Sequence, residues 1–418
     1  MKKGSMKQFV SLLVIGSILL ILPVCLKAAD VAEVKIGAIL PLSGESTPQG
    51  TMSKRGMDMA LEEINSAGGI KSLGGAKLKV IYSDSQTKPQ VAVSEAERLI
   101  SQENVAFLVG AYNSGVTLPA SEVAERYKKV WWCPVSSDLA ITNRGFKYVF
   151  RLAENSHTRV LAQLTNAFAI IKQSGVPVKT FACAWENNAY GQSLAVEWKK
   201  IIPENGYQIV LEEAYDPKTP DISPVVAKIK AANADIVMIA NSYMPATIMM
   251  AKAFVEQKVR PKAFFATSGA TSDPDYVKNA GDAALGVFDV SGWDPDVNRP
   301  FSKEVAKKFY DKYGVAMNNE TSKDYVGMYV VKDVLERAGS LDSEKLREAF
   351  AATNITEGIP QMYAKRVHFD STGTFPEISS LITVQFQRVN GKVERVTVWP
   401  PDQARPGYKP IFPYTYDQ

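Results

Sequence analysis

The chain has 418 residues and an ordinary globular composition, 46% hydrophobic and 22% charged, which is enough for two domains. Its formal charge of +4 comes from four lysines within the first 29 residues, a segment without acidic residues. The rest of the chain is neutral, which gives no electrostatic case for binding nucleic acid or for adhering to a membrane surface.

Residues 1–29 have the layout of a secretory signal peptide. A basic start is followed by the apolar run Phe9–Leu22 and then by small residues ending at Ala29. The run is shorter than the span of about 20 apolar residues that a membrane anchor needs. Cys25 could be acylated in a lipoprotein, but the preceding Leu-Pro-Val fits that signal poorly. We therefore expect export, with cleavage near Ala28 or Ala29.

Strand and helix patterns alternate from residue 33 to residue 144. The β-branched run EVKIGAIL leads into a helix with apolar residues at helical spacing, which stops at Gly68-Gly69. The pairs KLKVIYSD with QVAVSEAERLISQ and VAFLVG with GVTLPASEVAERY continue the pattern up to KVWWCPV. This alternation predicts a parallel sheet covered by helices on both faces.

A second series of the same kind starts at HTRVLAQLTNAFAIIKQSG and runs to LGVFDVSGW, which predicts a second α/β lobe. Two further helices, FSKEVAKKFYDKYG and TSKDYVGMYVVKDVLERAG, precede the strand-rich ISSLITVQFQRVNGKVERVTVWP. These late helices have no obvious partner in the second lobe. We expect the chain to cross back to the first.

Two hydroxyl clusters follow strands of the first lobe. They are AYNSG, with Ser114, and PVSSD, with Ser136, Ser137 and Asp138. Ligands of open parallel sheets bind beyond the carboxyl ends of the strands, where helix N-termini favour a carboxylate or another electronegative oxygen. The same residue types are also common helix N-caps. Both roles stay open, and they are compatible.

Four segments together resemble the periplasmic ligand-binding proteins of the branched-chain amino acid (leucine/isoleucine/valine-binding) type. In order, they are KIGAILPLSGESTPQGTMSKRGMDMALEEINSAGGI, LVGAYNSGVTLPASEVAE, ENNAYGQS and AGDAALGV. The resemblance covers nearly the whole chain after the signal segment. It implies an extracytoplasmic receptor of an ABC uptake transporter, with a small-molecule ligand and membrane permease subunits as partners.

The resemblance also implies the type I periplasmic binding protein fold, in which two doubly wound parallel-sheet lobes enclose a ligand cleft. Three hinge crossovers would fall near residues 153–156, 289–292 and 367–371. The expected N-terminal lobe comprises residues 30–154 with 290–366. The expected C-terminal lobe and tail comprise residues 155–289 with 367–418.

Site residues follow from the resemblance by position. Ser114 and Ser137 would hold the ligand carboxylate, and Val135 would contribute its backbone carbonyl. Tyr190, in NAYGQ, would cover the ligand from the second lobe, and Tyr243 lies in a comparable loop.

One position departs from the amino-acid binders of that family, which carry a glutamate for the ligand ammonium in the loop after KAFFAT. Here Gly269 stands at that place. An ammonium buried without a counter-charge costs several kcal/mol. Either Asp138, Glu186 or Asp324 serves instead, or the ligand lacks an ammonium.

A ligand without an ammonium group could be an aromatic acid or an amide, stacked on Trp185 or Trp293. Core packing is the more common role of tryptophan. The alternatives are therefore a receptor for amino acids or carboxylates, a receptor for aromatic acids, and a sensory protein of the same fold.

Other classes find little support in the sequence. His157 and His368 are the only histidines, and they stand outside any nucleophile-elbow motif. No motif indicates a phosphate loop, a dinucleotide site, zinc or an EF-hand. We expect no enzyme, no metal and no cofactor. Cys133 and Cys183 lie in strand-like apolar runs, and we expect them to be buried and unbridged.

Overall fold

The computed structural model describes Met1 and residues 32–416, where the chain forms two α/β lobes. The predicted signal peptide, with Cys25 and its cleavage site, lies outside the described residues apart from Met1. Each lobe has a central sheet with parallel strands and helices on both sides. The fold class predicted from the sequence is therefore confirmed.

The first lobe is built on a five-stranded parallel sheet in the order β2-β1-β3-β4-β5. The short strand β3 is buried along its whole length, as expected for a strand covered on both faces. The elements of this part are β1 (Glu33–Leu40), α1 (Thr47–Ser66), β2 (Lys77–Asp84), α2 (Pro89–Ser101), β3 (Phe107–Gly110), α3 (Ser114–Arg126), β4 (Trp131–Cys133) and β5 (Val149–Arg151).

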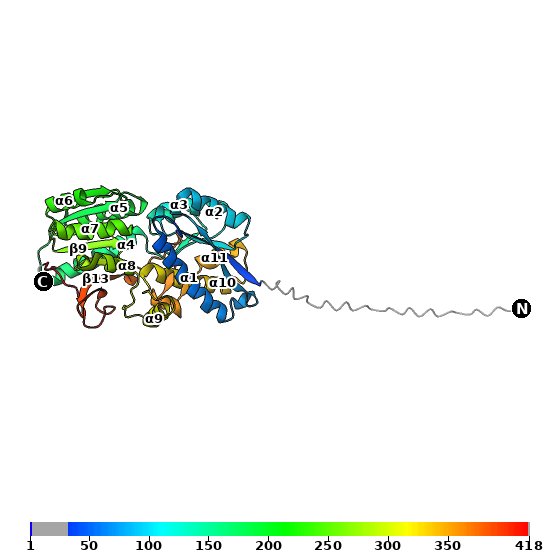
Figure 1. Cartoon of the computed structure of the whole chain (residues 1–418). Coiled ribbons are helices and arrows are strands. Elements are labelled where there is room, and N and C mark those ends of the chain that lie inside the picture. The colour runs from blue at the N-terminus through cyan, green and yellow to red at the C-terminus, as the bar shows by residue number, and fades with distance from the viewer. Residues whose placement is uncertain (2–31, 417–418) are drawn as a thin grey trace.

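The late helices return to the first lobe, as predicted (Figure 1). They are α9 (Ser302–Tyr313), α10 (Asn319–Ala338) and α11 (Ser343–Ala351), followed by the short strands β11 (Asn354–Ile355) and β12 (Val367–His368). Helix α10 packs closely along α1 because Gly56 has no side chain. A Cβ at that position would come within 2.6 Å of the Thr321 carbonyl oxygen.

The second lobe has a seven-stranded sheet in the order β14-β13-β10-β9-β8-β6-β7. Its elements are α4 (Ser156–Ser174), β6 (Thr180–Glu186), α5 (Ala189–Glu204), β7 (Gln208–Tyr215), α6 (Ser223–Ala232), β8 (Ile236–Asn241), α7 (Met244–Glu256), β9 (Ala263–Ser268), α8 (Pro274–Ala280), β10 (Phe288–Ser291), β13 (Ile382–Val389) and β14 (Lys392–Trp399).

This second sheet is mixed, whereas the sequence predicted parallel lobes throughout. β13 runs antiparallel to β10, and β14 runs antiparallel to β13. Asn390 and Gly391 connect these two strands with positive φ angles, the conformation that a tight hairpin turn requires. A two-residue connection leaves no room for the crossover helix of a parallel pair.

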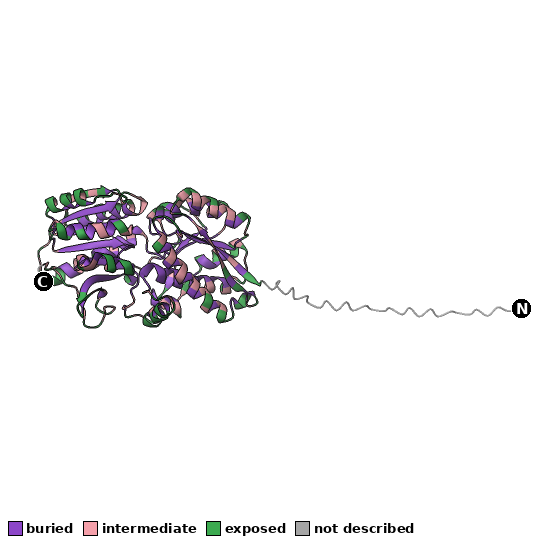
Figure 2. Cartoon of the chain, in the orientation of Figure 1, coloured by how far each residue is buried: buried purple, intermediate pink, exposed green. Residues whose placement is uncertain are grey.

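Each sheet has a hydrophobic core on both faces. Trp131 and Trp132 are neighbours on β4 and therefore point to opposite faces of the first sheet, each into a separate core. In the second lobe, Trp198 of α5 and Phe254 of α7 belong to the two cores on either side of the sheet. Figure 2 shows the strands largely buried and the outer faces of the helices exposed.

The chain passes between the lobes three times. The first crossing joins β5 to α4, and the second follows β10. The third lies later than residues 367–371. β12 still pairs with β11, and Thr374 still bridges to Arg151 of β5. These pairings hold the segment on the first lobe, so the chain leaves it only between residue 375 and β13.

Hydrogen bonds tie the three crossings together. At the first crossing, the Glu154 carboxylate accepts a hydrogen bond from the Tyr363 hydroxyl at 2.9 Å. The Arg299 guanidinium donates to the carbonyl of Gly292 at the second crossing and to the carbonyls of Tyr363 and Ser380. It also donates to the Gln403 side chain of the C-terminal tail. We call these residues the hinge cluster.

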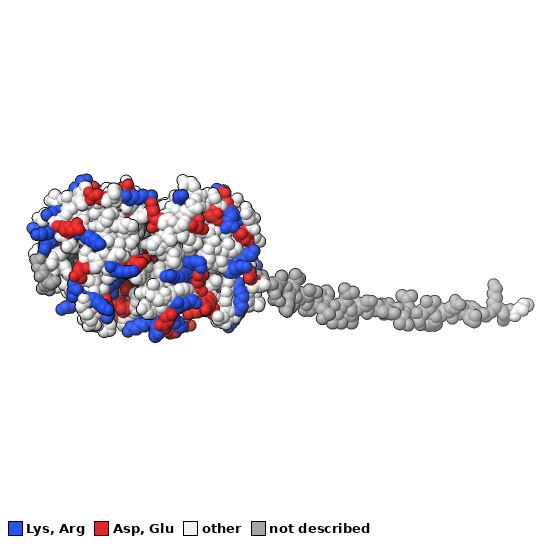
Figure 3. Space-filling view, viewed as in Figure 1, with Lys and Arg blue, Asp and Glu red and all other residues white. Residues whose placement is uncertain are grey.

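Charges of both signs are interspersed over the visible face of the two lobes (Figure 3). Among the described residues, no helix is both long and apolar enough to cross a bilayer. Cys133 and Cys183 are buried and unbridged, which confirms the prediction for these two thiols. They lie on β4 and β6, in different lobes.

Candidate ligand site

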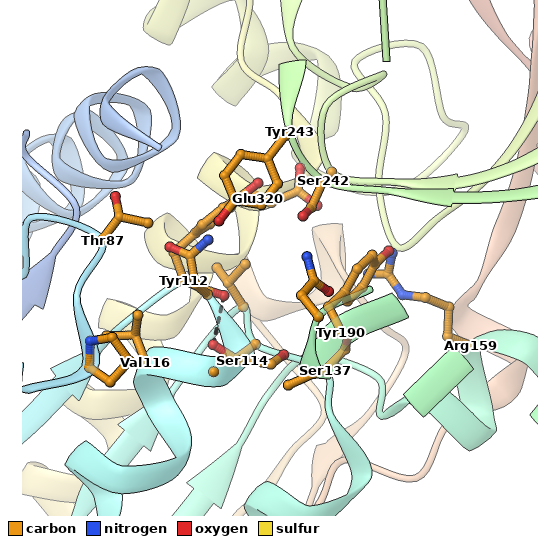
Figure 4. Close-up of a pocket in the computed structure, with 18 residues that line it drawn as sticks. Thr87, Tyr112, Ser114, Val116, Ser137, Arg159, Tyr190, Ser242, Tyr243 and Glu320 are labelled. Atoms are coloured by element: carbon orange, nitrogen blue, oxygen red, sulfur yellow. Dashed lines mark hydrogen bonds between the residues drawn. The ribbon is translucent and has the colours of Figure 1, made fainter. Parts of the chain in front are cut away.

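A cavity of about 190 Å³ lies between the lobes (Figure 4). Since a cavity of about 150 Å³ can hold benzene, its volume suits a small organic molecule. The first lobe contributes Thr87, Pro89, Tyr112, Asn113, Ser114, Gly115, Val116, Val135, Ser136, Ser137 and Glu320, and the second contributes Arg159, Asn188, Ala189, Tyr190, Ser242, Tyr243 and Gly269.

The N-terminus of α3 opens into this cavity at Ser114. Asn113 occupies the N-cap position, but its side chain makes no capping hydrogen bond and instead donates to the Ser46 hydroxyl at 3.1 Å. Within the described residues, the amide groups of Ser114 and Gly115 have no acceptor. The Ser114 hydroxyl accepts from the Asp138 amide at 3.2 Å and keeps its own proton to donate. These donors favour an anionic oxygen.

The two serines after β4 differ in what they can offer a ligand. The Ser136 hydroxyl donates to the Tyr112 carbonyl at 2.8 Å and lies 2.6 Å from the Thr117 hydroxyl, so its proton is already used. The Ser137 hydroxyl lines the cavity without a hydrogen-bond partner in the described part of the chain. Ser137 and Ser114 are therefore the hydroxyls with donors to spare.

The second lobe brings Tyr190 and Tyr243 to the other side of the cavity. Tyr190 lies in the first turn of α5, and its hydroxyl donates to the Thr267 carbonyl at 3.0 Å. Tyr243 precedes α7, and the Glu186 carboxylate accepts from its amide at 2.9 Å. Both rings line the cavity, so the lining comes from both lobes.

Glu186 orders this loop and is not part of the cavity lining. Its carboxylate accepts from the Ser242 amide, the Ser242 hydroxyl and the Asn188 side chain as well as from Tyr243. These hydrogen bonds act to lower the pKa of the carboxyl group, but burial outweighs them and raises it. Of the acids proposed from the sequence to replace the missing glutamate, Asp138 also lies outside the lining and accepts from the Ala140 amide at 2.8 Å.

Asp324, the third proposed acid, is buried and also outside the lining. Neither of its carboxyl oxygens makes a well-formed hydrogen bond among the described residues. Burial raises its pKa to about 7, although the nearby Ser53 hydroxyl and Lys323 act to lower it. The two tryptophans are core residues. Trp185 is 5% exposed with its ring facing the Lys199 ammonium at 5.2 Å, and Trp293 is fully buried and donates to the Ser302 hydroxyl.

The space beside Gly269 is filled by two residues that the sequence did not indicate. A Cβ at Gly269 would lie 2.8 Å from the Tyr112 hydroxyl and 3.9 Å from Oε1 of Glu320. Glu320 comes from the first turn of α10 and is 6% exposed. An acid at this helix position is common for reasons of the helix dipole alone, so nothing in the sequence set it apart.

Arg159 is a further lining residue that the sequence did not indicate. Its guanidinium pairs with the buried Glu154, and its Nε is buried without a partner among the described residues. Burial alone would raise the pKa of Glu154, but Arg159 and Lys323 outweigh it and hold that pKa at about 2. Six of the eight predicted site residues line the cavity, and Trp185 and Asp324 do not.

Comparison with known sequences identifies clear relatives. A sequence model of a periplasmic binding protein family matches residues 33–385. The Leu/Ile/Val-binding protein homolog 7 of Brucella suis is 30% identical over 379 residues, covering 88% of this chain and 92% of that protein.

Solved structures share the fold. A leucine-binding protein of Thermotoga maritima aligns with a TM-score of 0.76 at 23% identity, over 88% of this chain and 99% of that one. An ABC transporter solute-binding protein of Rhodopseudomonas palustris, in complex with 3,4-dihydroxybenzoic acid, aligns with a TM-score of 0.74 at 19% identity, over 90% and 99%. These relatives and neighbours are binding proteins and not enzymes.

Proposed function

Since the chain belongs to the periplasmic binding protein family, we propose that it is an extracytoplasmic receptor that captures a small carboxylate-bearing molecule by hinge closure. The receptor then delivers this ligand to the membrane permease of an ABC transporter. Residues 1–29 would direct its export.

One observation carries the carboxylate assignment. The hydroxyls of Ser114 and Ser137 and the first amides of α3 face one cavity, and none of these donors is used up by the protein. A carboxylate offers two strong acceptor oxygens to such a group of donors. The names of the neighbours support this choice, because leucine and 3,4-dihydroxybenzoic acid have little in common besides a carboxyl group.

The division of the lining between the lobes supports the proposed hinge closure. The serines belong to the first lobe, whereas Tyr190 and Tyr243 belong to the second. A ligand that contacts both sets has a higher affinity for the closed state and shifts the population towards it. Among the described residues, no group of three or more histidine, cysteine or acidic side chains could hold a metal ion.

A thermal-shift panel tests the ligand class. The purified protein is mixed with leucine, isoleucine, valine, benzoate and 3,4-dihydroxybenzoate, and with the matching neutral compounds leucinamide and benzamide. A ligand at 100 times its dissociation constant adds about 2.7 kcal/mol of stability. At least one acid should stabilise the protein while its neutral counterpart does not. Equal stabilisation by acid and amide, or none by any compound, would contradict the proposal.

Transport requires a separate test in cells. Cell fractionation should find the protein outside the cytoplasm in a form shortened at its N-terminus. Deleting its gene should abolish uptake of the radiolabelled ligand at low external concentration, and restoring the gene should restore uptake. Unchanged uptake in the deletion strain would refute the transport role while leaving the binding result intact.

A further inference from the structure

A second cavity, of about 760 Å³, lies beside the hinge cluster and shares no lining residue with the ligand site. We call it the hinge cavity. Helix α4 of the second lobe forms part of its wall, residues 364–366 of the first lobe form another part, and residues 377–381 of the third crossing complete it. A molecule in this cavity would therefore contact both lobes and a crossing between them.

Part of the hinge cavity wall is apolar. Ala162, Ile378 and Leu381 line it and belong to a small hydrophobic cluster with Val290, apart from the cores of the two lobes. Such a surface suits the apolar part of an organic molecule. Since a cavity of about 150 Å³ can hold benzene, the hinge cavity has room for a molecule of several rings.

Three cations and two acids line the hinge cavity, namely Arg299, Lys365, Arg366, Glu377 and Asp402. None of the three cations forms an ion pair with an acid among the described residues. Arg366 instead donates from Nε to the Asn354 side chain at 2.7 Å, and Glu377 lies 3.8 Å from Nδ1 of His368. The lining therefore carries one positive charge in excess.

Arg299 is the most enclosed of these cations. Its guanidinium donates to three backbone carbonyls and to the Gln403 side chain, all of them neutral acceptors. Burial lowers the pKa of this guanidinium to about 10, although Tyr363 and Asp402 act to raise it. A buried cation without a paired acid is stabilised by an anion placed beside it.

The hinge cluster lies between the two cavities. The Tyr363 hydroxyl donates to Glu154, which pairs with Arg159 of the ligand site. The Tyr363 carbonyl accepts from Arg299 of the hinge cavity. Since the walls of each cavity come from both lobes, movement of the lobes about the hinge cluster changes the shape of both.

We propose that the hinge cavity is a second binding site, which takes an organic anion with an apolar body and thereby stabilises the arrangement in which the two lobes touch. Ser272 donates to Glu320 across the ligand site, and Nζ of Lys218 lies 2.7 Å from Oε1 of Glu45. The hinge cavity has its present shape in this arrangement, so a molecule that fits it binds the touching lobes more tightly than separated ones. Binding there does not depend on which molecule the proposed receptor captures between its lobes.

A matched pair of fluorescent probes tests the site. 8-Anilinonaphthalene-1-sulfonate carries one negative charge on three aromatic rings, and N-phenyl-1-naphthylamine has the same rings without the charge. Three rings suit the hinge cavity better than the ligand site of about 190 Å³. Fluorescence titration of the wild-type protein should show a single saturable site for the sulfonate, with an affinity at least about fivefold higher than that of the neutral probe.

Three variants locate the bound probe. Thr165→Trp adds a ring at an exposed position of α4 that lines the hinge cavity, and it should abolish binding. Gln173→Trp is the matched control, because it adds the same ring at an exposed position of α4 outside the lining, and it should bind normally. Lys365→Gln combined with Arg366→Gln should lower the affinity for the sulfonate to that of the neutral probe. Unfolding midpoints establish that the variants fold.

Small-angle scattering measures the effect on the lobes. Saturating sulfonate should compact the wild-type protein and leave Thr165→Trp unchanged. Equal affinity for the two probes, or undiminished binding in Thr165→Trp, would overturn the hinge cavity as an anion site. Binding without compaction would overturn its effect on the lobes. Failure of every acid in the thermal-shift panel would refute the proposed function and leave the probe results unaffected.

Discussion

Replacing the serines of the cavity separates ligand contacts from structural hydrogen bonds. Ser137→Ala removes a hydroxyl that has no hydrogen-bond partner in the described part of the protein, so stability should change little. Bound ligand would then lose one donor and keep a buried oxygen without a partner. That loss costs about 1 to 3 kcal/mol, or roughly 5- to 150-fold in affinity. Ser114→Ala should weaken binding by a similar factor, but it also removes the acceptor of the Asp138 amide and should lower stability as well.

Ser136→Ala is the matched control, one residue away on the same loop. Its hydroxyl donates to the Tyr112 carbonyl at 2.8 Å and contacts the Thr117 hydroxyl, so the substitution leaves buried polar groups without partners. We expect the free energy of unfolding to fall by about 1 to 3 kcal/mol. Ligand affinity should fall less than in Ser137→Ala.

Calorimetry for affinity and urea unfolding for stability distinguish the two effects. The pattern to expect is weaker binding with normal stability in Ser137→Ala and weaker binding with some loss of stability in Ser114→Ala. In Ser136→Ala, stability should fall more than affinity. Unchanged affinity in both cavity-facing variants, with the fold intact, would refute the assignment of these hydroxyls to the ligand carboxylate.

Three further predictions concern closure, pH and thiols. Tyr190→Ala should reduce the ligand-induced compaction seen by small-angle scattering, whereas Tyr190→Phe keeps the ring and should compact more than Tyr190→Ala. If both variants compact as much as the wild type, Tyr190 is a packing residue only. Burial raises the pKa of Asp324 from 3.8 to about 7, so the folded protein keeps a proton that the unfolded chain releases, and stability falls as the pH rises through this range. Asp324→Asn removes this titrating group. The free energy of unfolding of the variant minus that of the wild type should rise by about 1.4 kcal/mol per pH unit between about pH 4 and pH 7 and then level off, as urea unfolding can measure. A difference that does not change with pH would contradict the assignment. Cys133 and Cys183 should resist alkylation in the native protein, because they are buried, and should both react after denaturation without reductant, as mass spectrometry would show; absence of label after denaturation would indicate a bridge.

The order of the strands in the sequence was enough to predict which loops of the first lobe lie at the cavity. Ser114 and Ser137 come just after β3 and β4, and the carboxyl ends of parallel strands meet at one edge of the sheet. Tyr190 and Tyr243 hold the equivalent positions in the second lobe. The series of strands and helices was therefore enough to place the two serine loops at the cavity, whereas Tyr190 and Tyr243 were expected from the resemblance to the family.

Residues that reach the cavity from elsewhere could not be predicted in this way. Glu320 belongs to a helix that returns to the first lobe after most of the second, and Arg159 lies within a helix where a charged residue is ordinarily exposed. Trp185 seemed suited to the cleft because it lies near the end of a strand. Its side chain points into the core instead, since neighbouring residues of a strand alternate between the two faces.

The hinge cluster bears on how the two lobes would move in the proposed closure. Three independent connections could each bend or twist separately, which would allow sliding as well as rotation. Glu154, Tyr363 and Arg299 bind the crossings to one another, so we expect the proposed opening to be a rotation about a single shared pivot. Gln403 extends that pivot into the C-terminal tail. Shortening the chain after Trp399 would therefore loosen the motion of the lobes at a distance, without altering any residue of the cavity.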